Sequence, residues 1–412
     1  MAQLNITLNQ DEILQLLCKD RNESFRQLFE SSLNALLEAE SSDQLRAGPY
    51  ERSPERQGVR NGSYDRALTT RIGKITLHVP RHRNQKFSTM IFDNYSRSEA
   101  SLIACMTEMV INGVSTRKVS RVVEEICGTS FSKSTVSELC KKLDGQVEDF
   151  RERPLTGNYP FMTVDATYFK VRERHRVVSK AFMIAFGTND QGHREILGFG
   201  VYHNESKETW NDFLRGLKKR GLSGVLMITS DAHEGILNAI SNVFPSVPWQ
   251  RCHFHFSKNI ADKAPKRYQA GLRSELTELW NCPTIGKAQQ KRDEIIHDYS
   301  DVAEAAMICL DEGFESAMTV MALPENLRRY YRTSNNIERL NRELKRRSHV
   351  IGIFPNEASL LRLMGSVLIE ENSSLKKGRA MFSSETYAAI LGSDTPLKLI
   401  TMAKEQQKVL AA

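Results

Sequence analysis

Hydrophobic residues recur at helical spacing near the start of the chain. Apolar side chains three and four positions apart within residues 13–17 and 25–37 predict one or two amphipathic helices. A polar segment, residues 39–58, then interrupts the pattern and is typical of a linker or an exposed loop. Residues 1–48 are therefore predicted to form an N-terminal helical region.

The next stretch has the apolar periodicity of paired strands, and it predicts a β-hairpin that turns near Gly73. Its apolar positions are Ile72, Ile75, Leu77 and Val79. Arginine and lysine are frequent in the same stretch, which makes it a candidate arm for lying along DNA. We assign residues 49–95 to this basic β-hairpin arm.

Helical spacing returns between residues 97 and 143, with a break at Gly128. Ser132 is a suitable N-cap for the second of two short helices, each of which carries an apolar stripe. Two such helices around a glycine-containing turn resemble a helix-turn-helix, although helical bundles that do not bind DNA show the same pattern. Residues 96–150 are predicted to be a helix-turn-helix DNA-binding domain.

Beyond Pro154 the chain changes to runs rich in β-branched and aromatic residues. Three successive runs, residues 161–171, 177–190 and 194–205, predict an antiparallel meander. A helix, a short strand, a second helix and a last strand over residues 249–256 follow it. Hairpin-connected strands followed by alternating strands and helices imply a mixed sheet in an α/β layer, and this order matches the ribonuclease H-like fold.

The chain of 412 residues is long enough for several domains. The predicted fold class is α/β: a ribonuclease H-like core with a helical insertion, preceded by the helical and helix-turn-helix region. The core is predicted in two parts, residues 155–256 and residues 332–370, the second of which is built on a glutamate-bearing helix. The helical insertion, residues 257–331, separates the two parts. A C-terminal helical tail, residues 371–412, follows them.

The composition excludes several other classes of protein. Hydrophobic residues make up 40% of the chain and charged residues 26%, as in ordinary globular proteins. No apolar run is long enough to span a membrane, and the first residues do not resemble a signal peptide, so we expect a cytoplasmic, nucleoid-associated protein without membrane contact. The seven cysteines are scattered without a CxxC pair, which indicates neither a disulfide framework nor a zinc finger.

The chain has a net charge of +7, and its positive residues are concentrated in two segments. Residues 56–86 contain eight lysines or arginines and one aspartate, and residues 328–347 contain eight against two glutamates. Local positive patches fit a polyanion such as DNA, because phosphate neutralisation with counterion release supplies affinity. A solvated protein surface explains the same charges equally well.

Two aspartates lie at positions where an α/β sheet gathers catalytic groups. Asp165 is in the middle of the first strand among apolar and aromatic neighbours, where a charge is costly unless it is paired or bound to a cation. Asp231 ends a short strand at the carboxyl edge of the sheet. Each has a structural alternative: a satisfied strand aspartate for Asp165 and a helix N-cap for Asp231.

A third carboxylate, Glu338, lies in a predicted amphipathic helix. At 100° per residue, Glu338 shares a polar face with Asn341, Arg342 and Lys345. The alternative is a capping-box-like start in which Asn335 is the N-cap and Glu338 the N3 residue.

Three carboxylates on such a scaffold suit two divalent cations that activate a water or a 3′-hydroxyl and stabilise a leaving oxygen. Mg²⁺ is the expected cofactor because it favours oxygen ligands, and Mn²⁺ should substitute for it.

With these features in place, the sequence resembles the Mutator-type transposases of bacterial insertion sequences, roughly from Gly58 to Phe354. The landmarks are VPRHR, NGVSTRKVSRVVEEICG, SKSTVSELCKKLD, TVDATYFKVR, GHREILGFG, TSDAHEGI, WQRCHFHFSKN and TSNNIERLNRELKRR. The resemblance implies that Asp165, Asp231 and Glu338 are the catalytic, metal-binding acidic (DDE) triad.

The resemblance also implies a function in DNA transposition. The protein would bind the terminal inverted repeats of its element, hydrolyse a phosphodiester and transfer the freed 3′ end to target DNA, as a homodimer or higher oligomer on DNA. The alternatives are a non-catalytic or domesticated DNA-binding regulator and a ribonuclease H-like nuclease without strand transfer.

The resemblance further singles out Cys252 and His255, a CxxH signature of uncertain role. No second pair stands at metal-ligand spacing, so no zinc is expected. Trp210 precedes the second aspartate and is either a base-stacking residue or a core residue, the latter being favoured.

The predicted DNA contacts divide among three segments: Arg71, Lys74, Arg81 and Arg83 in the arm; Arg117, Lys118, Lys133, Ser134 and Thr135 in the helix-turn-helix; and Arg342, Lys345 and Arg346 beside Glu338.

Overall fold

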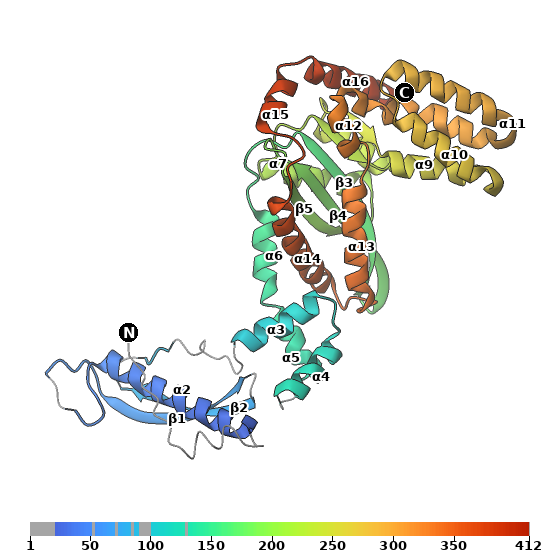
Figure 1. Cartoon of the computed structure of the whole chain (residues 1–412). Coiled ribbons are helices and arrows are strands. Elements are labelled where there is room, and N and C mark those ends of the chain that lie inside the picture. Colours follow the sequence, from blue (N-terminus) through green and yellow to red (C-terminus); the bar gives the residue numbers. More distant parts are fainter. Residues whose placement is uncertain are drawn as a thin grey trace. The chain divides into compact units, whose positions relative to one another are not determined.

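A computed structural model of the chain describes residues 21–51, 54–70, 73–83, 86–89, 100–127 and 131–411. These residues form two compact units that divide between Lys142 and Leu143, and each unit is described by itself (Figure 1). The apolar repeat at residues 13–17, Arg71 and the turn at Gly128 lie outside the described residues.

The first unit contains a two-stranded sheet packed on a helix. Strand β1 (Arg60–Thr70) pairs antiparallel with β2 (Gly73–His82), so the predicted hairpin is confirmed, although its first strand begins earlier than the apolar pattern indicates. Helix α2 (Arg21–Leu45) covers it. The shared core consists of Leu37, Leu68, Ile75, Leu77 and Val79.

The same unit contains three short helices, α3 (Ala100–Ile111), α4 (Thr116–Cys127) and α5 (Lys133–Cys140). The Ser132 hydroxyl accepts a hydrogen bond from the Thr135 backbone N–H, which confirms the predicted N-cap of α5. The helices bury a small apolar core that includes Met106, Val119 and Val136.

The second unit is built on a five-stranded mixed sheet with the order β5-β4-β3-β6-β7. The strands are β3 (Phe161–Glu173), β4 (Arg176–Thr188), β5 (Arg194–Tyr202), β6 (Met227–Ser230) and β7 (Trp249–Arg251). The first three pair antiparallel, which confirms the predicted meander. Strand β6 then pairs parallel to β3, and β7 parallel to β6, so the sheet is mixed, as expected.

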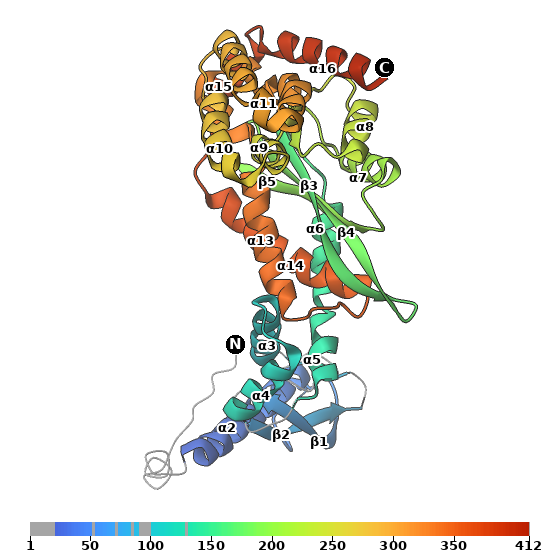
Figure 2. The same cartoon turned by 90° about the vertical axis from the view of Figure 1, so that its right-hand side faces the viewer.

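Helices cover both faces of this sheet (Figure 2). On one face, α7 (Lys207–Lys219) and α8 (Glu234–Val243) pack on alternate residues of β3 such as Met162 and Val164. On the other, α13 (Asn335–His349) and α14 (Glu357–Lys377) contact the strands, and α6 (Leu143–Glu152) packs on α14. The alternation of β3 therefore sends Asp165 towards α13.

The residues between the sheet and α13 are wholly helical, as predicted. They form α9 (His253–Asp262), α10 (Lys266–Trp280), α11 (Ile285–Ala317), the short 3₁₀ helix η1 (Thr319–Ala322) and α12 (Glu325–Tyr331). Two further helices, α15 (Ser384–Leu391) and α16 (Thr395–Ala411), follow α14. None of the described helices is both long and apolar enough to cross a membrane.

The predicted strand over residues 249–256 is wrong in its second half. Strand β7 ends at Arg251, and Cys252 is the N-cap of α9. His253, Phe256 and Ile260 are buried at intervals of three and four residues, so the segment presents one apolar face at helical spacing.

Trp210 is completely buried in the core between the sheet, α7 and α8. Its ring packs edge-on against Phe213, with 5.8 Å between the ring centroids. This position excludes stacking on a base and confirms the core interpretation.

Replacement of Trp210 by alanine should lower the free energy of unfolding by about 3–5 kcal/mol, because a large core side chain is lost and its cavity is only partly refilled. Denaturant unfolding followed by circular dichroism measures the effect, with Leu397→Ala, 69% exposed in the wild type, as the matched control. An unchanged midpoint for Trp210→Ala would contradict the core position.

Candidate active site

The two aspartates are brought together by the parallel pairing of β3 and β6. Thr163 pairs with Thr229, and two further residues along each strand bring Asp165 beside Asp231. Burial raises the pKa of Asp165 to about 7, and the negative charge of Asp231 is the next cause. The geometry and the electrostatics thus agree that these carboxylates are neighbours.

Asp231 is not a helix cap. Helix α8 begins at Glu234, and its N-cap is His233, whose Nδ1 accepts a hydrogen bond from the Gly235 backbone N–H at 3.2 Å. Asp231 Oδ1 is buried and has no hydrogen-bond partner among the described residues. An unpaired buried carboxylate oxygen is costly, and a bound cation would offset that cost.

Glu338 enters the site from the first turn of α13. The N-cap of this helix is Ser334, not the predicted Asn335, so the capping-box interpretation is wrong. The Ser334 carbonyl accepts the Glu338 backbone N–H at 3.0 Å, and the Ser334 hydroxyl donates to Glu338 Oε1 at 3.3 Å. Ser334 is only 1% exposed, so the carboxylate is oriented by a buried hydroxyl.

Asn341 connects α13 to the first aspartate. Its Nδ2 donates a hydrogen bond of 2.7 Å to Asp165 Oδ2, while its Oδ1 is buried without a partner among the described residues. Helical spacing from Glu338 placed Asn341 on the correct face, but nothing in the sequence indicated its contact with Asp165. This bond brings the third carboxylate to the other two.

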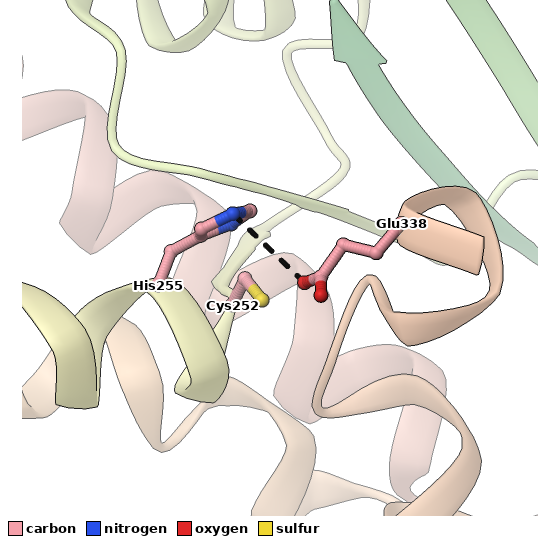
Figure 3. Close-up of side chains that lie close together, drawn as sticks. All are labelled: Cys252, His255 and Glu338. Atoms are coloured by element: carbon pink, nitrogen blue, oxygen red, sulfur yellow. Dashed lines mark ion pairs between the residues drawn. The ribbon is translucent and has the colours of Figure 1, made fainter. Parts of the chain in front are cut away.

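Figure 3 shows Cys252 and His255 converging on Glu338. His255 Nε2 is 3.9 Å from Glu338 Oε1, and one ligand atom from each of the three residues lies within 4.8 Å of the other two. The Cys252 sulfur also accepts the Ser334 backbone N–H and lies 3.1 Å from its hydroxyl. The CxxH pair therefore supports the start of α13.

These three side chains are also types that zinc uses as ligands. The sequence showed only the Cys252 and His255 half of this set, because Glu338 is distant along the chain. The absence of zinc stays a prediction.

The site places one positive group, His255, among its acidic groups. Burial alone raises the pKa of the Cys252 thiol, but the neighbouring His255 and Ser334 outweigh it and lower that pKa. Cys252 is in turn the largest cause of the rise in the pKa of His255 to about 9, to which the charges of Asp165 and Glu338 add. At neutral pH a charged imidazolium thus lies among the carboxylates and partly offsets their repulsion.

A fourth carboxylate, Glu205, lies in the loop before α7 and was not identified from the sequence. Burial raises its pKa, and the charge of Asp231 raises it further. The Tyr168 hydroxyl interacts with it from the face of β3 opposite to Asp165. No sequence pattern distinguished Glu205 from other loop acids, because its position depends on the fold.

The predicted DNA contacts that the structure describes are all exposed. In the first unit they are Lys74, Arg81, Arg83, Arg117, Lys118, Lys133, Ser134 and Thr135. In the second unit Arg342 and Lys345 are exposed along α13, whereas Arg346 forms an ion pair of 2.7 Å with Glu343. Their contact with DNA stays a prediction.

Comparison with known proteins shows a match along nearly the whole chain. The family described as "Transposase, Mutator family" matches residues 1–378. The chain is 41% identical over 374 residues to the transposase for insertion sequence element IS256 in transposon Tn4001 of Staphylococcus aureus, covering 90% of this chain and 96% of that protein.

Two further relatives are transposases of other elements. That of ISRM5 from Rhizobium meliloti is 38% identical over 352 residues, covering 85% of this chain and 88% of the relative. That of IS1081 from Mycobacterium tuberculosis is 37% identical over 379 residues, covering 90% and 91%.

The raised pKa of Asp165 predicts how the stability of the metal-free protein depends on pH. Because the folded-state pKa lies above the unfolded value, the proton on Asp165 stabilises the fold at low pH, and this contribution is lost as pH rises from about 4 through 7. Asp165→Asn should therefore raise the thermal unfolding midpoint at pH 8 and raise it less at pH 5.

The measurement is thermal unfolding in EDTA, with the exposed Asp212→Asn as the control. A variant that is less stable than the wild type at pH 8 would show that Asp165 carries no uncompensated charge in the metal-free site.

Proposed function

Because the chain belongs to the Mutator family of transposases, we propose that this transposase acts through an acidic triad formed by Asp165, Asp231 and Glu338. The triad would hold two divalent cations, Mg²⁺ or in its place Mn²⁺. These cations would supply Lewis acidity at the scissile phosphate. The observation that carries the proposal is the Asn341–Asp165 hydrogen bond, which brings the glutamate helix to the paired aspartates.

The residues of the site fit hard cations. Asp231 Oδ1 and Asn341 Oδ1 are buried oxygens without partners among the described residues, and both are ligand types that Mg²⁺ accepts. The raised pKa of Asp165 marks a carboxylate whose charge is not compensated by the protein alone. His255 and Ser334 would keep Glu338 oriented towards these oxygens.

We propose that the sheet is the core of a ribonuclease H-like fold. The support is its topology: three antiparallel strands in sequence, then two short strands that extend the sheet on the other side of β3, both parallel to it. Asp165 in the middle strand and Asp231 after β6 are the positions at which such a sheet places two carboxylates together.

The proposed reaction has two steps. In the first, a water oxygen bonds to the scissile phosphorus at the end of the element, the bond to the 3′ oxygen breaks, and this oxygen takes up a proton. In the second, the freed 3′-hydroxyl bonds to a phosphorus of target DNA and releases the target's own 3′ oxygen. Both steps are in-line displacements that suit paired carboxylates with divalent cations.

Recognition of the element's terminal inverted repeats is proposed for the first unit. The β1–β2 hairpin exposes Lys74, Arg81 and Arg83, and the capped helix α5 exposes Lys133 at its first turn. Two helices, α4 and α5, would act as a helix-turn-helix. A dimer or higher oligomer on DNA is proposed because two element ends must be joined in one complex.

Glu338→Gln should abolish metal-dependent cleavage of a labelled element-end duplex, because the amide keeps the shape of the side chain but removes its negative charge. Strand cleavage and joining would be measured with Mg²⁺ or Mn²⁺ against EDTA. The control is Glu325→Gln, which alters an exposed glutamate at the start of α12. Cleavage by Glu338→Gln at the wild-type rate would remove Glu338 from the triad.

Asp165→Ala should leave the affinity for element ends within about twofold of wild type, because phosphate contacts are proposed to lie on the basic surfaces instead. The same variant should yield no cleaved or joined product. A gel-shift titration beside the cleavage assay tests both. Wild-type binding without any product under either metal would instead favour a regulatory DNA-binding protein.

A further inference from the structure

The hairpin of β3 and β4 extends well beyond the rest of the sheet (Figure 2). Strand β5 pairs with β4 only from Ala181 onward, and β6 pairs with β3 only over residues 161–163. Residues 168–180 therefore form a two-stranded ribbon that projects from the unit carrying the active site.

One face of the ribbon is packed, and the edge of β3 is bonded to the segment that follows α13. The Arg172 backbone N–H donates to the Phe354 carbonyl at 2.8 Å, and the Phe354 N–H donates to the Lys170 carbonyl at 2.9 Å. On this face the Phe169 and Phe354 rings meet edge to face, with centroids 6.2 Å apart. The ribbon is thus held in place by the segment that follows α13.

The opposite face is open, and its charge has one sign. Tyr168, Lys170 and Arg172 are exposed along β3, and Arg174 and Arg176 are exposed at the turn. None of the four cationic side chains forms a hydrogen bond or ion pair with another described residue. Glu173, the single acid of the ribbon, pairs with the buried Lys180 at 3.0 Å.

The turn of the ribbon carries a basic residue at a position where a residue with a Cβ is destabilising. Arg174 and His175 have φ values of 46° and 65°, a left-handed conformation that hairpins usually reserve for Asn-Gly or Asp-Gly. Side chains with a Cβ are costly there, and such strain is typical of positions retained for function.

The open face is on the side of β3 opposite to Asp165, and it reaches the edge of the active site at Tyr168. Tyr168, 45% exposed, interacts with Glu205, whose pKa responds to Asp231. Lys170 and Arg172 are five and seven residues beyond Asp165, which is about 17 and 23 Å at about 3.3 Å per strand residue. These distances correspond to about five to seven base pairs of DNA at about 3.4 Å each.

We propose that this ribbon surface, defined as Tyr168, Lys170 and Arg172 on the open face together with Arg174 and Arg176 at the exposed turn, binds the phosphate backbone of target DNA beside the point of joining. Lysine and arginine neutralise phosphates in duplexes of any sequence, and the face lacks the asparagine and glutamine side chains that read adenine. A sequence-independent surface suits the target better than the element ends. The inference rests on the proposed transposase mechanism.

The test uses the full-length chain with Lys170, Arg172, Arg174 and Arg176 all changed to alanine. Joining of a precut end with a free 3′-hydroxyl to a target plasmid should fall at least about tenfold, because up to four phosphate contacts are lost. Cleavage of an uncut end should stay within about twofold of the wild-type rate under the same salt conditions. Binding to a random-sequence duplex should weaken and become less salt-dependent.

The control changes Lys404 and Lys408, two exposed lysines of α16, which lies at the other end of the unit (Figure 2). Unchanged joining and random-duplex binding by the ribbon variant would overturn the proposal. Parallel loss of cleavage and joining would overturn it too, because the ribbon would then hold the element end. Failure of the proposed transposase mechanism can be told apart from failure of the ribbon proposal, because the wild type itself would then give no product. The comparison of duplex binding would still decide whether the ribbon binds DNA.

Discussion

The repulsion between two neighbouring, partly buried carboxylates is the constraint on which the second unit depends. Parallel pairing of β3 with β6 brings Asp165 beside Asp231, and burial first, then the charge of Asp231, raises the pKa of Asp165. A fold that only needed stability would place apolar side chains there, as it does with Met162 and Val164 on the opposite face of β3. A bound cation would offset the repulsion between the two carboxylates.

The surrounding residues limit that cost and set the geometry. Asn341 holds one oxygen of Asp165 in place, and Ser334 holds one oxygen of Glu338. His255 contributes a positive charge 3.9 Å from Glu338, and its neighbour Cys252 anchors Ser334. Cys252 and His255 of the CxxH signature thus contact the start of α13, the helix that carries the third carboxylate. These contacts explain why a cysteine and a histidine are found at the two positions.

The sequence predicted what short-range patterns determine. Strand alternation located the meander and the faces of β3, and the Ser132 cap was read from local chemistry. The sequence-based predictions were wrong where tertiary contacts decide the structure. The N-cap of α13 is Ser334 and not Asn335, because the Ser334 hydroxyl is buried against Cys252. The second half of the last predicted strand is part of α9, because its apolar residues share a helical face. Glu205 joins the site only through folding, so no local pattern could identify it.

Three carboxylates from separate elements are proposed to bind divalent cations together. The most direct test is titration of Mn²⁺ into the full-length protein, followed by electron paramagnetic resonance, for the wild type and Asp231→Asn. The wild type should bind Mn²⁺ tightly, whereas Asp231→Asn should lose this binding while its thermal unfolding midpoint in EDTA stays the same or rises. Equal Mn²⁺ binding by both proteins would contradict this proposal, since the aspartate beside Asp165 would then hold no cation.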